Sequence, residues 1–128
     1  GYWSCCDVGV QLNPTLVDGQ THGGIAMGIG HAMMERMVYD ANKQLLSGSF
    51  MDYQIPRAGD LPMIVTDYKV TPSSANSHGM RGMGELPTIG APAALANAVA
   101  CAVEKYDIQA PFTPERLWQA IHNHDTAE

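Results

Sequence analysis

The sequence predicts a mixed α/β fold, with a small mixed sheet and packed helices, in a single domain spanning residues 1–128. Two observations support this prediction, one for the fold class and one for the single domain. Apolar residues run at strand spacing near the start and in the middle of the chain, and recur at helical spacing between and after these runs. In addition, a chain of 128 residues has the length of one ordinary domain. Strands separated by helices belong to the mixed class.

The composition predicts a chain that is part of something larger. Only 16% of its residues are charged, against a typical share of roughly 25%, while 45% are hydrophobic. Other protein is expected to cover such a surface, because large exposed apolar patches favour association. We therefore expect a fragment or processed subunit that forms oligomers.

Charge and cysteine use exclude several function classes. The net charge is −6 and the seven Lys and Arg are scattered, so nucleic acid is not an expected partner. No apolar run approaches the roughly 20 residues of a bilayer span, so we expect no membrane span. The adjacent Cys5 and Cys6, with a distant Cys101, have neither iron–sulfur nor disulfide spacing, which indicates a reducing, cytoplasmic setting.

In the first third of the chain we expect a strand over Tyr2–Val10, with Cys5 and Cys6 on opposite faces. Asn13-Pro14 is typical of a turn. A helix from about Gly19 to Met37 follows, with Asp18 as its N-cap. Its apolar positions at helical spacing are Ile25, Ile29, Ala32, Met33 and Met37.

This helix is unusually rich in glycine, at positions 19, 23, 24, 28 and 30. Each glycine costs about 1 kcal/mol relative to alanine inside a helix. Close packing of another backbone or close approach of a ligand would compensate, because only glycine leaves that space empty. The residues themselves leave both explanations open.

Further along, Val38–Leu46 is typical of a hairpin, Ser49–Ile55 is expected to be extended, and Met63–Val70 to form a strand. The residues on one face of that strand are Ile64, Thr66, Tyr68 and Val70.

The C-terminal third is expected to hold two helices. Glycines and prolines predict an irregular stretch over residues 79–92, followed by a helix over Pro92–Val103 with proline in its first turn. A last helix begins at Thr113-Pro114-Glu115, with threonine as N-cap. Its expected buried face consists of Leu117, Trp118 and Ile121, and His122 and His124 are expected in a solvated tail.

The most informative stretch for chemistry is Gly82-Met83-Gly84-Glu85. A carboxylate on a glycine-rich loop ahead of a buried helix has little structural purpose. Partial burial between Met83 and Leu86 would favour the neutral form of Glu85 and suit it for accepting a proton. Alternatively, Glu85 caps the following backbone N–H groups.

Three segments resemble the molybdenum hydroxylase family, which includes xanthine oxidase, aldehyde oxidoreductases and the large subunits of aerobic carbon monoxide dehydrogenases. Residues 82–91 resemble its GxGE segment, Asn13-Pro14 with residues 18–30 resemble its pterin-contacting segment, and residues 48–56 resemble a third. Their order and coverage identify the sequence as a member of this family, as the C-terminal part of a molybdopterin-binding large subunit.

The resemblance implies that Glu85 is the base that takes a proton from a molybdenum-bound water as its oxygen attacks an aldehyde, an N-heterocycle or a similar electron-poor carbon. It also implies that the dithiolene of molybdopterin holds the metal, so that no protein ligand is needed. The implied cofactor contacts are Gln20, His22, Gly23, Gly24, Gly82, Met83 and Gly84. Many relatives carry a glutamine at the position of Met27, so no contact is carried over there.

The resemblance leaves open whether the pterin carries a cytosine dinucleotide. It implies that 2Fe–2S centres and FAD lie on other domains or subunits, and that the partners are the rest of the large subunit, these redox subunits and a small-molecule substrate. Two alternatives are a non-catalytic cofactor-binding or scaffolding module, and metal-free hydrolysis by Glu85 with His22 or His78. Residues 28–33 fail the dinucleotide fingerprint at its last glycine, which excludes a nicotinamide fold.

Overall fold

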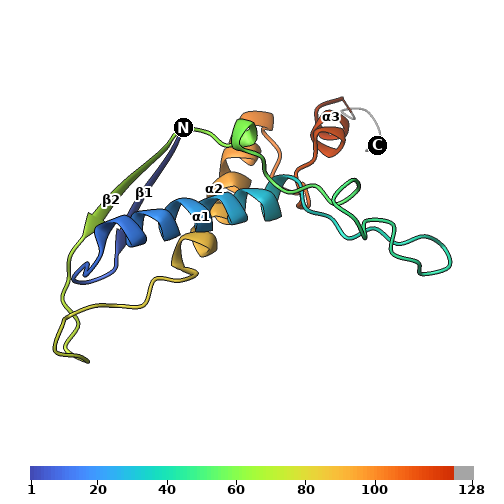
Figure 1. Cartoon of the computed structure of the whole chain (residues 1–128). Coiled ribbons are helices and arrows are strands. Elements are labelled where there is room, and N and C mark those ends of the chain that lie inside the picture. Colours follow the sequence, from blue (N-terminus) through green and yellow to red (C-terminus); the bar gives the residue numbers. More distant parts are fainter. Residues whose placement is uncertain (123–128) are drawn as a thin grey trace. The chain divides into compact units, whose positions relative to one another are not determined.

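The computed structural model describes residues 1–122, so His124 lies outside the described part. The elements there are β1 (Tyr2–Asp7), α1 (Pro14–Met33), a 3₁₀ turn (Ala58–Asp60), β2 (Ile64–Lys69), α2 (Leu86–Val103) and α3 (Pro114–His122) (Figure 1). This mixture confirms the predicted fold class. The chain divides into two compact units, Gly1–Gly28 with Arg57–Gly90, and Ile29–Pro56 with Ala91–Glu128.

The strands of the first unit are parallel neighbours. Figure 1 shows β1 and β2 side by side, in a register that pairs Tyr2 with Ile64 and Asp7 with Lys69. Exposure alternates along β2, and its half-buried face carries the predicted Ile64, Thr66 and Tyr68. Val70 follows the strand and is exposed.

Alternation along β1 also places its two cysteines as predicted. Cys5 is exposed and Cys6 is half-buried, and both are free thiols. The opposite-face prediction for this pair is therefore confirmed.

The N-terminal half of α1 is attached to β2 by buried and half-buried polar groups. The Asp18 carboxylate accepts hydrogen bonds from Thr66 Oγ1 (2.6 Å) and Tyr68 Oη (2.9 Å), and Tyr68 Oη also lies 2.9 Å from Thr21 Oγ1. The bonds from Thr66 and Tyr68 lower the pKa of Asp18, while burial raises the pKa of Tyr68. These contacts hold the cofactor-binding candidates of α1 against the sheet.

The predicted bounds of α1 are wrong at both ends. Asn13 is the cap, since its Oδ1 accepts the Leu16 N–H at 3.1 Å, and Pro14 occupies the first helical position, where a missing N–H costs nothing. Asp18 therefore lies inside the helix, and α1 ends at Met33 rather than Met37. Of the five predicted apolar positions, Ile25, Ile29 and Ala32 are buried, while Met33 is half-buried and Met37, beyond the end of the helix, is exposed.

The loop that leads to Gly82 is fastened to the end of β1. Arg81 N–H donates to Val8 O at 2.9 Å, and Gly9, with φ of 65°, lies against the carbonyl of Gly79 where a Cβ atom would not fit. Hydrogen bonds from Thr71 and Gly9 hold the pKa of Asp7 at about 2. The backbone at the start of the glycine-rich loop is therefore held against the end of β1.

In the second unit, the predicted hairpin is confirmed as a tight turn. Tyr39 and Leu45 form an antiparallel bridge, although residues 38–46 form no named strand in the described chain. The extended stretch predicted over Ser49–Ile55 is wrong, because the N–H groups of Asp52 and Tyr53 fold back onto Ser49 O at 3.1 and 2.8 Å.

The start of α2 also differs from the prediction. The helix begins at Leu86 and contains Gly90 and Pro92, so the irregular stretch expected up to residue 92 is wrong over its second half. Pro87 is accommodated because it lies in the first turn, where backbone N–H groups lack helical partners. With 18 residues and a mean hydropathy of 1.5, α2 is long and apolar enough to cross a membrane. Core helices of soluble proteins share this property.

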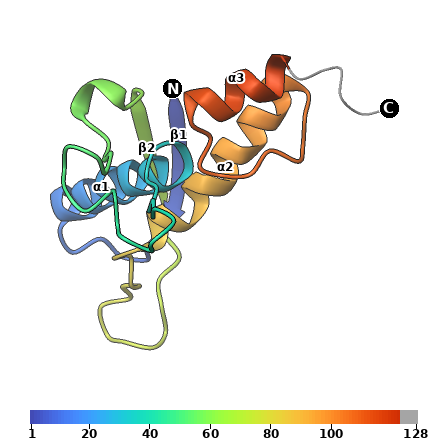
Figure 2. The ribbon, with the colours of Figure 1, turned by 90° about the vertical axis from the view of Figure 1, so that its right-hand side faces the viewer.

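The cap predicted for α3 is confirmed, and its buried face is not. Thr113 Oγ1 lies 3.4 Å from Arg116 N, and Pro114 is the first helical residue. Trp118 and Ile121 are 60% and 48% exposed, so the predicted buried face is wrong apart from the half-buried Leu117. Figure 2 shows α3 beside the end of α2.

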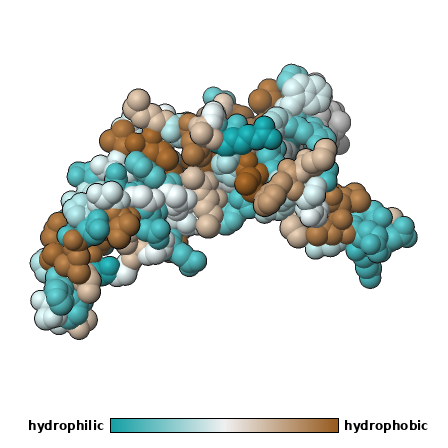
Figure 3. Space-filling view, viewed as in Figure 1, coloured by the Kyte–Doolittle hydropathy of each residue, from teal (hydrophilic) through white to brown (hydrophobic). Residues whose placement is uncertain are grey.

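Large apolar side chains reach the surface at many places, as the hydrophobic areas in Figure 3 illustrate. Exposed examples from both units are Trp3, Leu16, Phe50, Met51, Met63, Ile89, Tyr106 and Trp118. We predict that the isolated 128-residue chain self-associates, because association buries these groups. Light scattering at increasing concentration is expected to give a mass above 13.8 kDa, and a strictly monomeric mass would contradict the prediction.

Candidate cofactor-binding site

Two of the segments singled out in the sequence meet at Gln20. Its Nε2 donates to the carbonyl oxygen of Gly84 at 3.3 Å, across 64 residues of sequence. The side chain is exposed, and the amide oxygen has no bond to residues 1–122. Gln20 therefore joins α1 to the GxGE loop and keeps one acceptor for a further group.

The two adjacent glycines of α1 have different surroundings. A Cβ atom on Gly24 would lie 2.9 Å from Pro87 Cβ and 3.2 Å from Thr88 Oγ1, so Gly24 provides the close packing between α1 and the first turn of α2. Around a Cβ atom on Gly23, nothing in the described chain lies within 4 Å. Packing explains Gly24, whereas Gly23 presents open backbone of the kind that admits a ligand.

The residues of the GxGE loop also fall into two groups, one that packs against the fold and one that leaves open space. Met83 is half-buried and lines an apolar cleft of about 160 Å³ together with residues that include Val8, Val10, Leu12 and Val17. Its side chain anchors the loop. Gly82 and Gly84 have open space around them in the part of the chain that the structure describes.

Glu85 is exposed and immediately precedes α2. Its carbonyl accepts the N–H of Thr88 at 3.1 Å, while its carboxylate makes no hydrogen bond within residues 1–122. The burial expected from Met83 and Leu86 is not found, and neither is the alternative of a side-chain cap on the helix. The carboxylate is therefore free to meet a group outside this chain.

The other polar candidates do not assemble a site with Glu85. His22 is exposed on α1, and His78 Nδ1 lies 3.3 Å from Ser77 Oγ. Neither imidazole forms a hydrogen bond with Glu85 in the described residues, so the hydrolytic pair has no structural support. Arg81 Nε lies 4.0 Å from Asp7 Oδ1 and forms an ion pair with it.

Sequence reasoning missed Thr88. Its hydroxyl donates to the Gly24 carbonyl at 3.1 Å and connects the same two segments as Gln20. A threonine three residues after the GxGE glutamate, opposite a helix rich in glycine, was an available signal for this contact.

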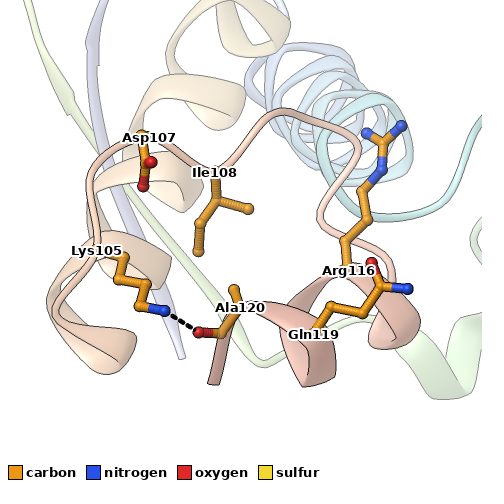
Figure 4. A pocket seen from close by; sticks show the side chains of 6 residues that line it. All are labelled: Lys105, Asp107, Ile108, Arg116, Gln119 and Ala120. Atoms are coloured by element: carbon orange, nitrogen blue, oxygen red, sulfur yellow. Dashed lines mark hydrogen bonds between the residues drawn. The ribbon is translucent and has the colours of Figure 1, made fainter. Parts of the chain in front are cut away.

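A surface hollow of about 270 Å³ in the second unit is a poorer candidate. Figure 4 shows its lining residues, Lys105, Asp107, Ile108, Arg116, Gln119 and Ala120. Its cations are already engaged: Lys105 Nζ donates to Ala120 O, and Arg116 Nη1 donates to Ala110 O at 2.7 Å. These bonds hold α3 to the preceding loop and leave little reason for an anion to bind.

The geometry of the first unit fits an organic cofactor better than a directly ligated metal. No group of three potential metal ligands occurs among residues 1–122. A cofactor that carries its own metal ligands needs hydrogen-bonding groups and open backbone, and Gln20, Gly23, Gly82 and Gly84 offer these. The first unit of this mixed α/β protein thus offers the kind of open surface that an organic cofactor needs.

Comparison with known proteins identifies the cofactor class. A family model described as a molybdopterin cofactor-binding domain matches residues 1–62. The large subunit of nicotine 6-hydroxylase from Paenarthrobacter nicotinovorans is 40% identical over 92% of the chain and 15% of its own length. The carbon monoxide dehydrogenase large chain of Hydrogenophaga pseudoflava is 34% identical over 98% of the chain and 16% of its own.

A solved structure agrees with these relatives. Quinoline 2-oxidoreductase from Pseudomonas putida 86 superposes with a TM-score of 0.87 at 39% identity, over 94% of this chain and 16% of that one. The chain belongs to the molybdenum hydroxylase family, as part of a molybdopterin-binding domain. It spans about one sixth of the relatives it matches. Their names are those of enzymes, which does not favour the scaffolding alternative.

Proposed function

We propose that the polypeptide carrying this chain is a molybdenum-dependent hydroxylase or dehydrogenase. It would act on an aldehyde, an N-heterocycle or a similar electron-poor carbon and insert oxygen derived from water. The observation that carries the proposal is the Gln20–Gly84 hydrogen bond, which brings the pterin-contacting segment next to Glu85. By itself the 128-residue chain is expected to be inactive, since it spans about one sixth of its relatives.

Each residue of the site receives a defined role. Glu85 accepts a proton through its free carboxylate, and Gln20 orients the cofactor through the amide oxygen that Gly84 leaves unused. The open backbone at Gly23, Gly82 and Gly84 admits the pterin closely. Bound molybdopterin supplies the redox centre that removes electrons from the substrate.

Three candidates take smaller roles. Gly24 acts through packing against Pro87, and Met83 acts by anchoring the loop in its apolar cleft. His22 is exposed on α1, next in sequence to Gly23, and would line the edge of the cofactor region.

The surroundings of the chain are proposed on the same basis. The rest of the large subunit covers the exposed apolar side chains of α2 and α3, and further domains or subunits carry 2Fe–2S centres and FAD. A cytosine dinucleotide on the pterin is compatible with the open face of α1 at Gly23. The free cysteines suit a reducing, cytoplasmic location, and the assembly is oligomeric.

The proposal is tested by the molybdenum and pterin content of the purified polypeptide and of its Gln20→Leu variant. The unmodified protein is expected to contain stoichiometric molybdenum. The variant loses both the amide contact and the bond to Gly84, and is expected to bind the cofactor roughly fivefold more weakly and to retain less molybdenum, since a hydrogen bond to the cofactor contributes about 1 kcal/mol.

The matched control is Gln44→Leu, at an exposed glutamine of the second unit, which is expected to keep full molybdenum content. Unmodified protein without molybdenum, when produced alongside the cofactor, would overturn the proposed function. Equal loss of molybdenum in Gln20→Leu and Gln44→Leu would contradict the proposed role of Gln20 in cofactor binding.

A further inference from the structure

Glu85 has no contact of its own that fixes the position of its carboxylate. The side chain is exposed and unbonded within residues 1–122, so its place depends on the backbone before and after it. A catalytic base loses much of its effect when it is displaced by about 1 Å. The residues that hold this backbone therefore matter for any reaction that uses Glu85.

Two side-chain to backbone bonds hold the backbone on either side of Glu85. Gln20 Nε2 donates to Gly84 O at 3.3 Å, and Thr88 Oγ1 donates to Gly24 O at 3.1 Å. Gln20 and Gly24 are one helical turn apart, so both bonds originate from the same face of α1. The first bond is exposed and the second is half-buried, where competition from water is weaker.

Thr88 holds the turn through two of its atoms. Its N–H donates to the Glu85 carbonyl at 3.1 Å, and its hydroxyl reaches across to α1. The absence of a side chain on Gly24 makes this approach possible, since a Cβ atom there would lie 3.2 Å from both Thr88 N and Thr88 Oγ1. One residue thus links the Glu85 backbone to the helix that carries the cofactor contacts.

We propose that Thr88 is a positioning residue for Glu85, fixing the start of α2 on α1 so that the carboxylate lies correctly relative to Gln20. The inference rests on the proposed function of Glu85 as a base. Thr88 itself touches neither substrate nor cofactor in this scheme. Met27 Sδ, 4.0 Å from the same hydroxyl, is a weaker acceptor than the Gly24 carbonyl.

The test compares Thr88→Val with Thr88→Ser in the cofactor-loaded full polypeptide. Valine keeps the branched shape and removes the donor, whereas serine keeps the donor. Thr88→Val is expected to lower kcat about tenfold, with KM within about twofold and molybdenum content unchanged. Thr88→Ser is expected to keep kcat within about twofold.

A second readout does not depend on turnover. Amide hydrogen exchange of the loop peptide around residues 82–86 is expected to become roughly tenfold faster in Thr88→Val, while the β1 peptide (Tyr2–Asp7) stays unchanged. Thr15→Val is the matched control, because Thr15 is exposed on α1 and its hydroxyl is unbonded in the described residues. It is expected to change neither readout.

The outcomes separate this inference from the proposed function. Normal kcat or unchanged loop exchange in Thr88→Val would overturn the positioning role, and so would loss of molybdenum, faster exchange in β1 or failure of serine to restore kcat. Normal turnover by Glu85→Gln, measured alongside, would instead overturn the role of Glu85 as base.

Discussion

Replacing Glu85 with glutamine is expected to lower kcat by about 10²–10⁴-fold while molybdenum content stays the same. The amide keeps the size and polarity of the side chain but cannot accept the proton. Cofactor content is expected to be preserved because the carboxylate makes no hydrogen bond within residues 1–122, so its loss disturbs nothing in the described fold.

The measurement is steady-state oxidation of a panel of aldehydes and N-heterocycles with an artificial electron acceptor, together with molybdenum analysis. Glu115→Gln is the matched control, since Glu115 is an exposed glutamate in the first turn of α3. It is expected to leave kcat unchanged. Full activity of Glu85→Gln would show that another group accepts the proton, and loss of molybdenum would make Glu85 a cofactor-binding residue.

The elements that were predicted well are those whose signals are local. Alternating exposure along β2 follows from its sequence pattern, and the Thr113-Pro114 start of α3 follows from capping chemistry. Asn13-Pro14 carried the same kind of signal for α1 and was interpreted only as a turn. An asparagine followed by proline serves both purposes, and here its side chain caps a helix.

The start of α2 depends on contacts distant in sequence. Locally, Pro87, Gly90 and Pro92 disfavour a helix. Docking of the first turn on Gly24, with the Thr88 hydrogen bond, favours it, and this contact joins residues 64 positions apart. The spacing of apolar residues within one segment cannot predict such a contact, because the contact depends on a distant segment.

The site shows the same division between local and distant information. The GxGE segment located Glu85 and the pterin-contacting segment located Gln20, and the Gln20–Gly84 hydrogen bond brings these two segments together. The predicted burial of Glu85 and of Trp118 depended on surfaces that residues 1–122 do not provide. Both side chains remain exposed in this chain.

The second large predicted effect is on stability. Substitutions at the adjacent Gly23 and Gly24 of α1 are expected to change the free energy of unfolding in opposite directions. Gly24→Val is expected to destabilise the fold by about 1–3 kcal/mol, because the first added carbon already lies 2.9 Å from Pro87 Cβ and 3.2 Å from Thr88 N. A ring carbon and a backbone nitrogen yield little, so the first turn of α2 must move away from α1. The midpoint of urea unfolding of the cofactor-free polypeptide measures this loss.

Gly23→Ala is the matched change at the neighbouring position, where nothing in the described chain lies within 4 Å of the added carbon. Without cofactor it is expected to stabilise α1 by about 0.5–1 kcal/mol, since alanine is the better helix former. Lower molybdenum content is nevertheless expected, because the methyl group occupies the space proposed for the pterin. A variant that is both more stable and fully loaded with molybdenum would show that the open face of Gly23 has no part in cofactor binding.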